Sequence, residues 1–261
     1  MEQGLIISDA PVLSAGAARN ALVDFMSQPG SYRRRFLQKE YGYAFDGYSH
    51  HGQSDSTHQA ADDLLHSFVF SDFYPQQRYP LEFQAYLNDD WTALTTTLRQ
   101  VEITLLQTLP TWVRGQYESD FGHMMSANYY PPLAQFDTPA SGHTRLSAHP
   151  DVSLLTVFPF GIDQHFQYRD SSGSWHSAPA TDRMIAFPGY LMQWLSHGAI
   201  PALNHRVQLA ADNAADRYSF AIFSLPRPGT SVYRESDCRS GEREYLAAEE
   251  YFSQYVSLWD Y

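Results

Sequence analysis

The first 120 residues carry mainly the helical spacing of apolar side chains. In residues 80–109, apolar residues recur at intervals of three, four and seven until Pro110 ends the run. Residues 15–27 show a shorter pattern of the same kind, and residues 4–7 resemble a short strand. The pattern therefore predicts an N-terminal part made of helices and loops.

From about residue 121 the pattern changes to short runs of aromatic and β-branched residues, separated by glycine and proline. The runs are 124–130, 152–158, 166–168, 184–187, 191–195, 207–209 and 218–223. Many short strands at this spacing are typical of a sandwich or barrel. The sequence contains no internal repeat and no low-complexity linker. We therefore expect a single domain over 1–261, with a helical and loop part at 1–120, a β core at 121–230 and a closing C-terminal helix within 231–261.

Composition and charge narrow the class of protein. The chain has 261 residues, of which 43% are hydrophobic and 18% charged, so it can form a sizeable core. Its formal net charge of -12 gives no general attraction to nucleic acid or to anionic lipid. No secretory signal and no apolar run of membrane-spanning length are visible. These features predict a cytoplasmic protein with neither a nucleic acid nor a membrane as partner.

Cysteine content limits the kinds of metal site. Cys238 is the single cysteine, and we expect it to be an inert thiol, whereas the chain has 11 histidines. One cysteine excludes an intramolecular disulfide framework and any metal site built on several thiolates. A bound metal must therefore be held by histidines and carboxylates.

Two histidines and one aspartate form a candidate metal site. His149 and Asp151 stand two residues apart at the start of a strand-like run, so in an extended chain they point to the same side. His205 begins another strand-like run. Two histidines with one carboxylate are the facial triad that holds Fe(II) and leaves adjacent positions open.

A candidate carboxylate-binding pair follows in the run 217–225. Its alternation places Arg217, Ser219, Ala221 and Phe223 on one face. A guanidinium and a hydroxyl two residues apart on a strand can grip one carboxylate together. Tyr130, in the segment Asn-Tyr-Tyr-Pro at 128–131, can bring a phenolic hydroxyl to the same place, although a structural core tyrosine is an equal reading.

Three further residues are candidates for contact with a substrate. Tyr48 and His51 lie in a loop rich in glycine, tyrosine and histidine, which is either a plain surface loop or a lid over a barrel mouth. Arg145 precedes the His-x-Asp pair and can meet an acidic substrate, but an exposed turn charge is an equal reading.

The order of four motifs resembles the isopenicillin N synthase-like branch of the Fe(II)/2-oxoglutarate-dependent oxygenases. The motifs are Asn-Tyr-Tyr-Pro at 128–131, His-x-Asp at 149–151, His-Arg-Val at 205–207 and Arg-x-Ser at 217–219. The resemblance implies an α+β protein with a mainly β core, a double-stranded β-helix or jelly roll, flanked by N-terminal helices and a C-terminal helix. It implies Fe(II) on His149, Asp151 and His205. It also implies that Arg217 and Ser219, with Tyr130 and Asn128, hold 2-oxoglutarate, which O2 converts to succinate while a small-molecule C–H bond is oxidised, most often to an alcohol.

Some features depart from the family pattern. The family usually has Gly-Asp before the strand that leads to the second histidine, whereas Tyr190 follows Gly189 here. Two other functions therefore stay open. The first is an isopenicillin N synthase-like Fe(II) oxidase that does not use 2-oxoglutarate, and the second is a catalytically silent jelly-roll binding protein.

Overall fold

The computed structural model describes residues 4–8, 13–41, 45–52, 63–136, 144–209, 215–235 and 242–257. Cys238 lies outside these residues, so the prediction made for it is not addressed by the structure.

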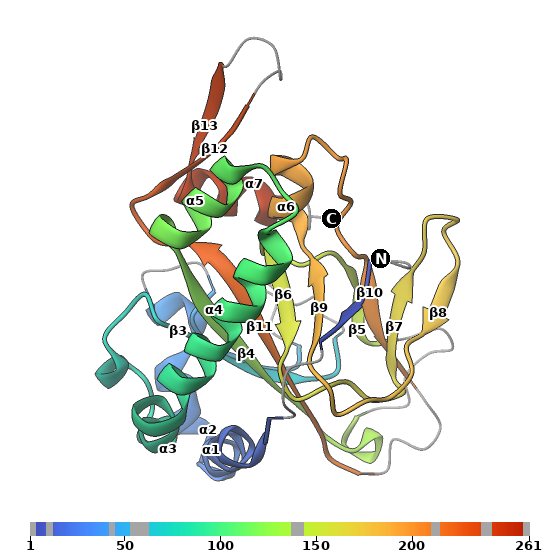
Figure 1. Cartoon of the computed structure of the whole chain (residues 1–261). Helices are drawn as coiled ribbons and strands as arrows, with labels where there is room; N and C mark the ends of the chain where they lie inside the picture. Colours follow the sequence, from blue (N-terminus) through green and yellow to red (C-terminus); the bar gives the residue numbers. More distant parts are fainter. Residues whose placement is uncertain are drawn as a thin grey trace.

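Thirteen strands of the described chain form three antiparallel sheets (Figure 1). The largest sheet has seven strands in the order β1-β9-β6-β11-β4-β3-β2, the second has the order β5-β10-β7-β8, and β12 pairs with β13. The strands are β1 (Ile6–Ile7), β2 (Gly47–Ser49), β3 (His66–Ser71), β4 (Phe121–Tyr130), β5 (Thr144–His149), β6 (Leu155–Phe158), β7 (Phe166–Arg169), β8 (Trp175–Ser177), β9 (Ile185–Pro188), β10 (His205–Gln208), β11 (Arg217–Pro226), β12 (Ser231–Glu235) and β13 (Arg243–Ala247).

Helices cover the outside of the seven-stranded sheet (Figure 1). The α-helices are α1 (Gly16–Ser27), α2 (Gly30–Arg33), α3 (Leu81–Tyr86), α4 (Thr92–Leu106), α5 (Thr111–Asp120), α6 (Tyr190–Leu195) and α7 (Ala248–Ser257). Short 3-10 turns are η1 (Arg34–Phe36), η2 (Gln38–Glu40), η3 (Gln76–Arg78) and η5 (Leu133–Gln135), and η4 (Leu87–Trp91) is π-helical.

The two long central strands β4 and β11 pack against helices on one face and face the second sheet on the other. Met125 and Ala127 of β4 and Ile222 of β11 pack with α1, α3 and α4 in one hydrophobic cluster, which includes Leu94 and Leu98 of α4. The alternate residues of both strands face the second sheet. Because both faces are covered, β4 is buried along nearly its whole length.

The predicted fold class is confirmed: the protein is mixed α and β, with a large antiparallel core of the jelly-roll type. The helical pattern of 80–109 is also confirmed, although η4 interrupts it between α3 and α4. The strand predicted at 191–195 is wrong, because these residues form α6. An apolar run of five residues fits either a strand or a buried helix. The helical tail begins as strand β13 before α7.

Within the described ranges, no helix combines the length and the apolar composition needed to cross a bilayer.

Candidate active site

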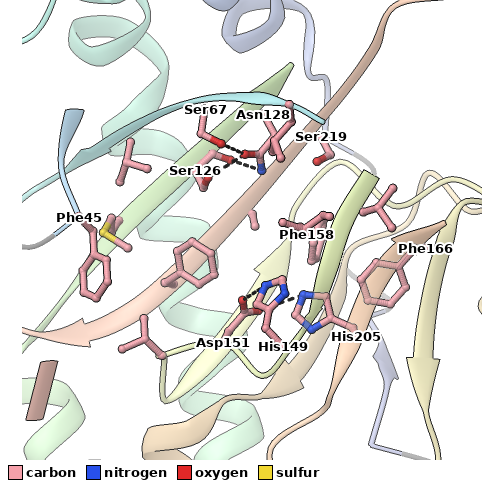
Figure 2. A pocket seen from close by; sticks show the side chains of 18 of the residues that line it. Phe45, Ser67, Ser126, Asn128, His149, Asp151, Phe158, Phe166, His205 and Ser219 are labelled. Atoms are coloured by element: carbon pink, nitrogen blue, oxygen red, sulfur yellow. Dashed lines mark hydrogen bonds and ion pairs between the residues drawn. The ribbon is translucent and has the colours of Figure 1, made fainter. Parts of the chain in front are cut away.

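A cavity lies between the two larger sheets, and its walls come from both of them (Figure 2). Strands β3, β4 and β11 supply one wall, and β5, β7 and β10 supply the wall that faces it.

The predicted triad meets at this cavity. His149 ends β5, His205 begins β10, and these two residues are paired across the strands. One ligand atom from each of His149, Asp151 and His205 lies within 4.8 Å of the others. His149 Nε2 is 3.4 Å from Asp151 Oδ1, and His205 Nε2 is 3.7 Å from Asp151 Oδ2. Figure 2 shows the three side chains turned toward one another.

Both imidazoles are oriented through their other nitrogen. His149 Nδ1 lies 2.7 Å from the carbonyl oxygen of Ser147, and His205 Nδ1 lies 3.2 Å from that of Leu203. A carbonyl oxygen accepts only, so each Nδ1 donates to it, and Nε2 is the ring nitrogen left for a metal ion. This is the orientation that a metal ligand needs.

Burial and charge set the protonation of the triad in opposite directions. Burial and the neighbouring His149 lower the pKa of His205 to about 4, against the pull of Asp151. Burial would raise the pKa of Asp151, but His205, His149 and a hydrogen bond from Thr156 (2.7 Å) lower it overall. Burial also opposes the charge on His149, whose pKa is nevertheless raised by Asp151. The triad therefore offers a carboxylate and at least one neutral imidazole near neutral pH, as metal binding requires.

Asp151 is held in a loop, which we call the triad loop (residues 150–153). Its four successive carbonyl oxygens all accept hydrogen bonds. Tyr255 and Tyr251 of α7 donate to Pro150 and Val152, and the amides of residues 190 and 191, at the start of α6, donate to Asp151 (2.6 Å) and Ser153 (3.1 Å). The extended-strand argument for residues 149 and 151 is therefore incomplete, because β5 ends at 149 and these two helices place Asp151.

The predicted carboxylate-binding residues also come together. Arg217 pairs with Tyr130, and Ser219 pairs with Asn128, across β11 and β4. All four residues line the cavity, as do Ala221 and Phe223 at the predicted alternate positions. The Arg217 guanidinium carbon lies 4.4 Å from the centre of the Tyr130 ring. Burial raises the pKa of the Tyr130 hydroxyl, while Arg217 and Ser219 oppose that rise.

Asp163 holds the outer side of Arg217. Its Oδ2 accepts from Nε at 2.5 Å, and its Oδ1 accepts from Nη2 at 3.2 Å. This fork leaves Arg217 Nη1 buried with no hydrogen-bond partner among the described residues. Burial would raise the pKa of Asp163, but Arg217 lowers it, so the pair is charged. Burial would lower the pKa of Arg217, which Tyr130 and Asp163 nevertheless raise.

A polar strip crosses the middle of the wall formed by β3 and β4. Ser67 and Ser126 both donate to the side-chain oxygen of Asn128, at 2.5 and 3.0 Å (Figure 2). The Asn128 NH2 group in turn donates to the carbonyl oxygen of Ser126 at 3.5 Å, so both ends of the amide are hydrogen-bonded within the strip.

None of the three predicted substrate-contact residues lines this cavity. Tyr48 lies buried in β2, with its hydroxyl 3.1 Å from Arg33 Nη1 and 3.0 Å from His66 Nδ1. His51 Nδ1 bonds to the carbonyl of Asp63 at 3.0 Å. Arg145 is 1% exposed, donates to the carbonyl of Pro131 and lies behind Tyr130.

Sequence reasoning missed Asp163, Thr156, Tyr251 and Tyr255. The partners of Asp163 and of the two tyrosines lie 54, 99 and 105 residues away, so no local pattern connects them. Gly189 is the residue in the sequence that could have indicated a close backbone contact with the triad loop. A Cβ at this position would lie 2.3 Å from the carbonyl oxygen of Ser153, so only glycine allows the close approach.

One family model matches part of the chain. Residues 121–226 match the family model described as the 2OG-Fe(II) oxygenase superfamily. No protein with a curated description matches the chain.

Solved structures share the fold at low sequence identity. A Caulobacter crescentus protein described as a member of the 2OG-Fe(II) oxygenase family is 18% identical, with 99% of this chain and 90% of that chain covered and a TM-score of 0.72. A full-length Neurospora crassa protein in complex with alpha-KG and thymine is 16% identical, with 98% and 87% covered and a TM-score of 0.74. The rice dioxygenase for auxin oxidation is 16% identical, with 98% and 86% covered and a TM-score of 0.69.

Proposed function

We propose that this enzyme, whose residues 121–226 match the family model of the 2OG-Fe(II) oxygenase superfamily, uses Fe(II) and 2-oxoglutarate to oxidise a C–H bond of a small molecule. Hydroxylation, with decarboxylation of 2-oxoglutarate to succinate, is the outcome that we propose. The observation that carries the proposal is the convergence of His149, Asp151 and His205 in one cavity with Arg217 and Ser219.

The residues present fit both groups. Two imidazole nitrogens and one carboxylate suit Fe(II) in chemistry and number. Arg217 Nη1 is a buried donor with no partner among the described residues, and the Arg217 side chain lines the same cavity. A buried unpaired guanidinium nitrogen is costly unless an acceptor arrives, and a carboxylate of the co-substrate is such an acceptor.

Each part of the chain then has a task in the reaction. Fe(II), 2-oxoglutarate and O2 together supply an oxidant strong enough to take hydrogen from a C–H bond. His149, Asp151 and His205 hold the metal, and the triad loop keeps Asp151 in place. Arg217, Ser219, Tyr130 and Asn128 bind and orient the co-substrate carboxylate. Apolar walls exclude water from the reacting centre, which prevents side reactions.

The motif order also supports placement in the isopenicillin N synthase-like branch. That branch includes enzymes that keep the triad and the Arg-x-Ser motif but use no 2-oxoglutarate. The unpaired donor of Arg217 favours the 2-oxoglutarate-dependent reaction over this alternative. Contact of Tyr48, His51 and Arg145 with the substrate stays a prediction, since none of the three lines the cavity described above.

Oxygen uptake by the Fe(II)-loaded protein, with and without 2-oxoglutarate and with succinate assayed, tests the proposal. We expect both signals to require 2-oxoglutarate. Arg217→Ala should raise the apparent KM for 2-oxoglutarate by about 100-fold, because a charged hydrogen-bonded contact is worth several kcal/mol. Arg114→Ala removes a partly exposed arginine of α5 that pairs with Glu118 and does not line the cavity, and it serves as the control. Absence of succinate, or an unchanged KM in Arg217→Ala, would contradict the proposal.

A further inference from the structure

The cavity has two chemically different ends along β4 and β11. Tyr130 and Arg217 pair at one end, and Met124 and Phe223 pair three alternate positions further along. At about 6.8 Å for each two-residue step, the ends are about 20 Å apart. We call them the carboxylate end and the apolar end.

The carboxylate end is closed behind Tyr130. Leu65, Leu146 and Val207 pack with Tyr130 in a small hydrophobic cluster, and all of them line the cavity. A co-substrate that reaches from Arg217 to the triad fills this end. The substrate must therefore occupy the other side of the triad.

The apolar end carries no charged side chain among the described residues. Six residues of one hydrophobic cluster line it: Phe45, Val69, Met124, Val152, Phe223 and Tyr255. The Tyr255 hydroxyl is already used, because it donates to the carbonyl of Pro150 at 2.8 Å. In Figure 2 Phe45 lies across the triad from Phe158, Phe166 and Ser219.

The charged groups that line the rest of the cavity already have roles in binding the metal or the co-substrate. Among the described lining residues, the charged or metal-binding groups are the triad and Arg217. Arg145 does not line the cavity. A carboxylate or ammonium group in the apolar end would lose its hydration and find no opposite charge, which costs several kcal/mol.

The polar strip of Ser67, Ser126 and Asn128 lies between the two ends. Both serine hydroxyls donate to Asn128 Oδ1, and the Asn128 NH2 group donates to the carbonyl oxygen of Ser126 at 3.5 Å. Under the proposed function the other hydrogen of this NH2 group serves the co-substrate, so the strip supplies no partner for a charged group on the substrate.

We infer that the substrate is an uncharged, mainly apolar small molecule. The inference rests on the proposed function, because the co-substrate must take the carboxylate end. The apolar end should therefore bind carboxylic acids and amines of the same size more weakly than the neutral molecule.

Three naphthalenes of matched size test this substrate class. They are 1-acetylnaphthalene, 1-naphthoate and 1-naphthylmethylamine, titrated by calorimetry into protein loaded with Co(II) and 2-oxoglutarate. We expect 1-acetylnaphthalene to bind at least about tenfold more tightly than either charged probe. Phe45→Ala should weaken its binding by about tenfold, whereas Phe160→Ala, a phenylalanine outside the cavity lining, should leave it unchanged.

The outcomes separate this inference from the proposed function. Tightest binding of 1-naphthoate, especially if Arg145→Gln abolishes it, would overturn the neutral substrate class. Equal or absent binding of all three probes would overturn it as well. If Phe45→Ala fails to fold, the ranking of the probes on the unmodified protein still decides. The titration of 2-oxoglutarate that precedes the probes reports separately, because failure to bind it would contradict the proposed function.

Discussion

The triad loop and Arg217 serve the same cavity but are held in place differently. Four successive carbonyls of the triad loop accept hydrogen bonds from α6 and α7. Arg217 is anchored by the single carboxylate of Asp163, whose side chain is 38% exposed. The comparison indicates that the metal site is built to be rigid, whereas the grip on the co-substrate depends on one partly solvated ion pair.

Loss of a triad carboxylate should give the largest effect. Asp151→Ala removes one of three metal ligands from a buried site. We expect succinate formation to fall by roughly 1,000-fold or more and Co(II) affinity to fall with it, while circular dichroism still shows a folded protein.

Asp170→Ala is the matched control for this variant. Asp170 also pairs with a histidine, since His176 Nε2 lies 2.6 Å from its Oδ2, but the pair lies outside the cavity. Retained turnover in Asp151→Ala, or equal loss in both variants, would remove the metal assignment.

The anchoring of the triad loop by α7 should give the next largest effect. Tyr251→Phe combined with Tyr255→Phe leaves the carbonyls of Pro150 and Val152 without these donors. An unsatisfied buried carbonyl costs about 1–3 kcal/mol, so we expect Co(II) affinity to fall by about tenfold and the melting temperature to fall by several degrees.

Tyr86→Phe tests whether any buried tyrosine hydroxyl would do the same. Tyr86 is 4% exposed, and its hydroxyl lies 4.0 Å from the sulfur of Met125 in the other large hydrophobic cluster. A drop in melting temperature with unchanged Co(II) affinity in the double variant would make the two tyrosines purely structural.

The same contrast explains what could be predicted from the sequence. The alternation of Arg217 and Ser219 is a local property of an extended strand, and the structure places both residues on the cavity face as predicted. Asp151 was found as a motif member, but its position depends on helices far away in the chain. Periodicity carries no information about such contacts.

Residues 191–195 show most clearly what the sequence pattern could not predict. Their apolar run predicts a strand, yet Gly189 approaches the triad loop so closely that the chain turns there and α6 begins. The amides at the start of α6 then bond to the triad loop. The departure from the family pattern at Gly189 and Tyr190 was visible in the sequence, but its consequence depended on tertiary packing.

Asp163 should give the smallest and most informative effect. A partly exposed ion pair is worth at most about 1 kcal/mol, so Asp163→Asn should weaken 2-oxoglutarate binding to the Co(II)-loaded protein by about fivefold. The maximal rate at saturating 2-oxoglutarate should stay unchanged, because Asp163 touches Arg217 and not the triad. Asp163→Glu keeps the charge and should restore part of the affinity. Asp170→Asn, at a half-buried aspartate outside the cavity, serves as the control.

The direction of the change in Asp163→Asn separates two roles for this carboxylate. If Asp163 orients the guanidinium so that Nη1 faces the cavity, its loss weakens binding, since the arginine then has more orientations to lose. If Asp163 instead competes with the co-substrate for the same positive charge, its loss strengthens binding. The fork of two hydrogen bonds uses Nε and Nη2 and leaves Nη1 without a partner among the described residues, so we expect weaker binding. Tighter binding in the variant would show that the resting site neutralises its arginine until 2-oxoglutarate displaces the aspartate.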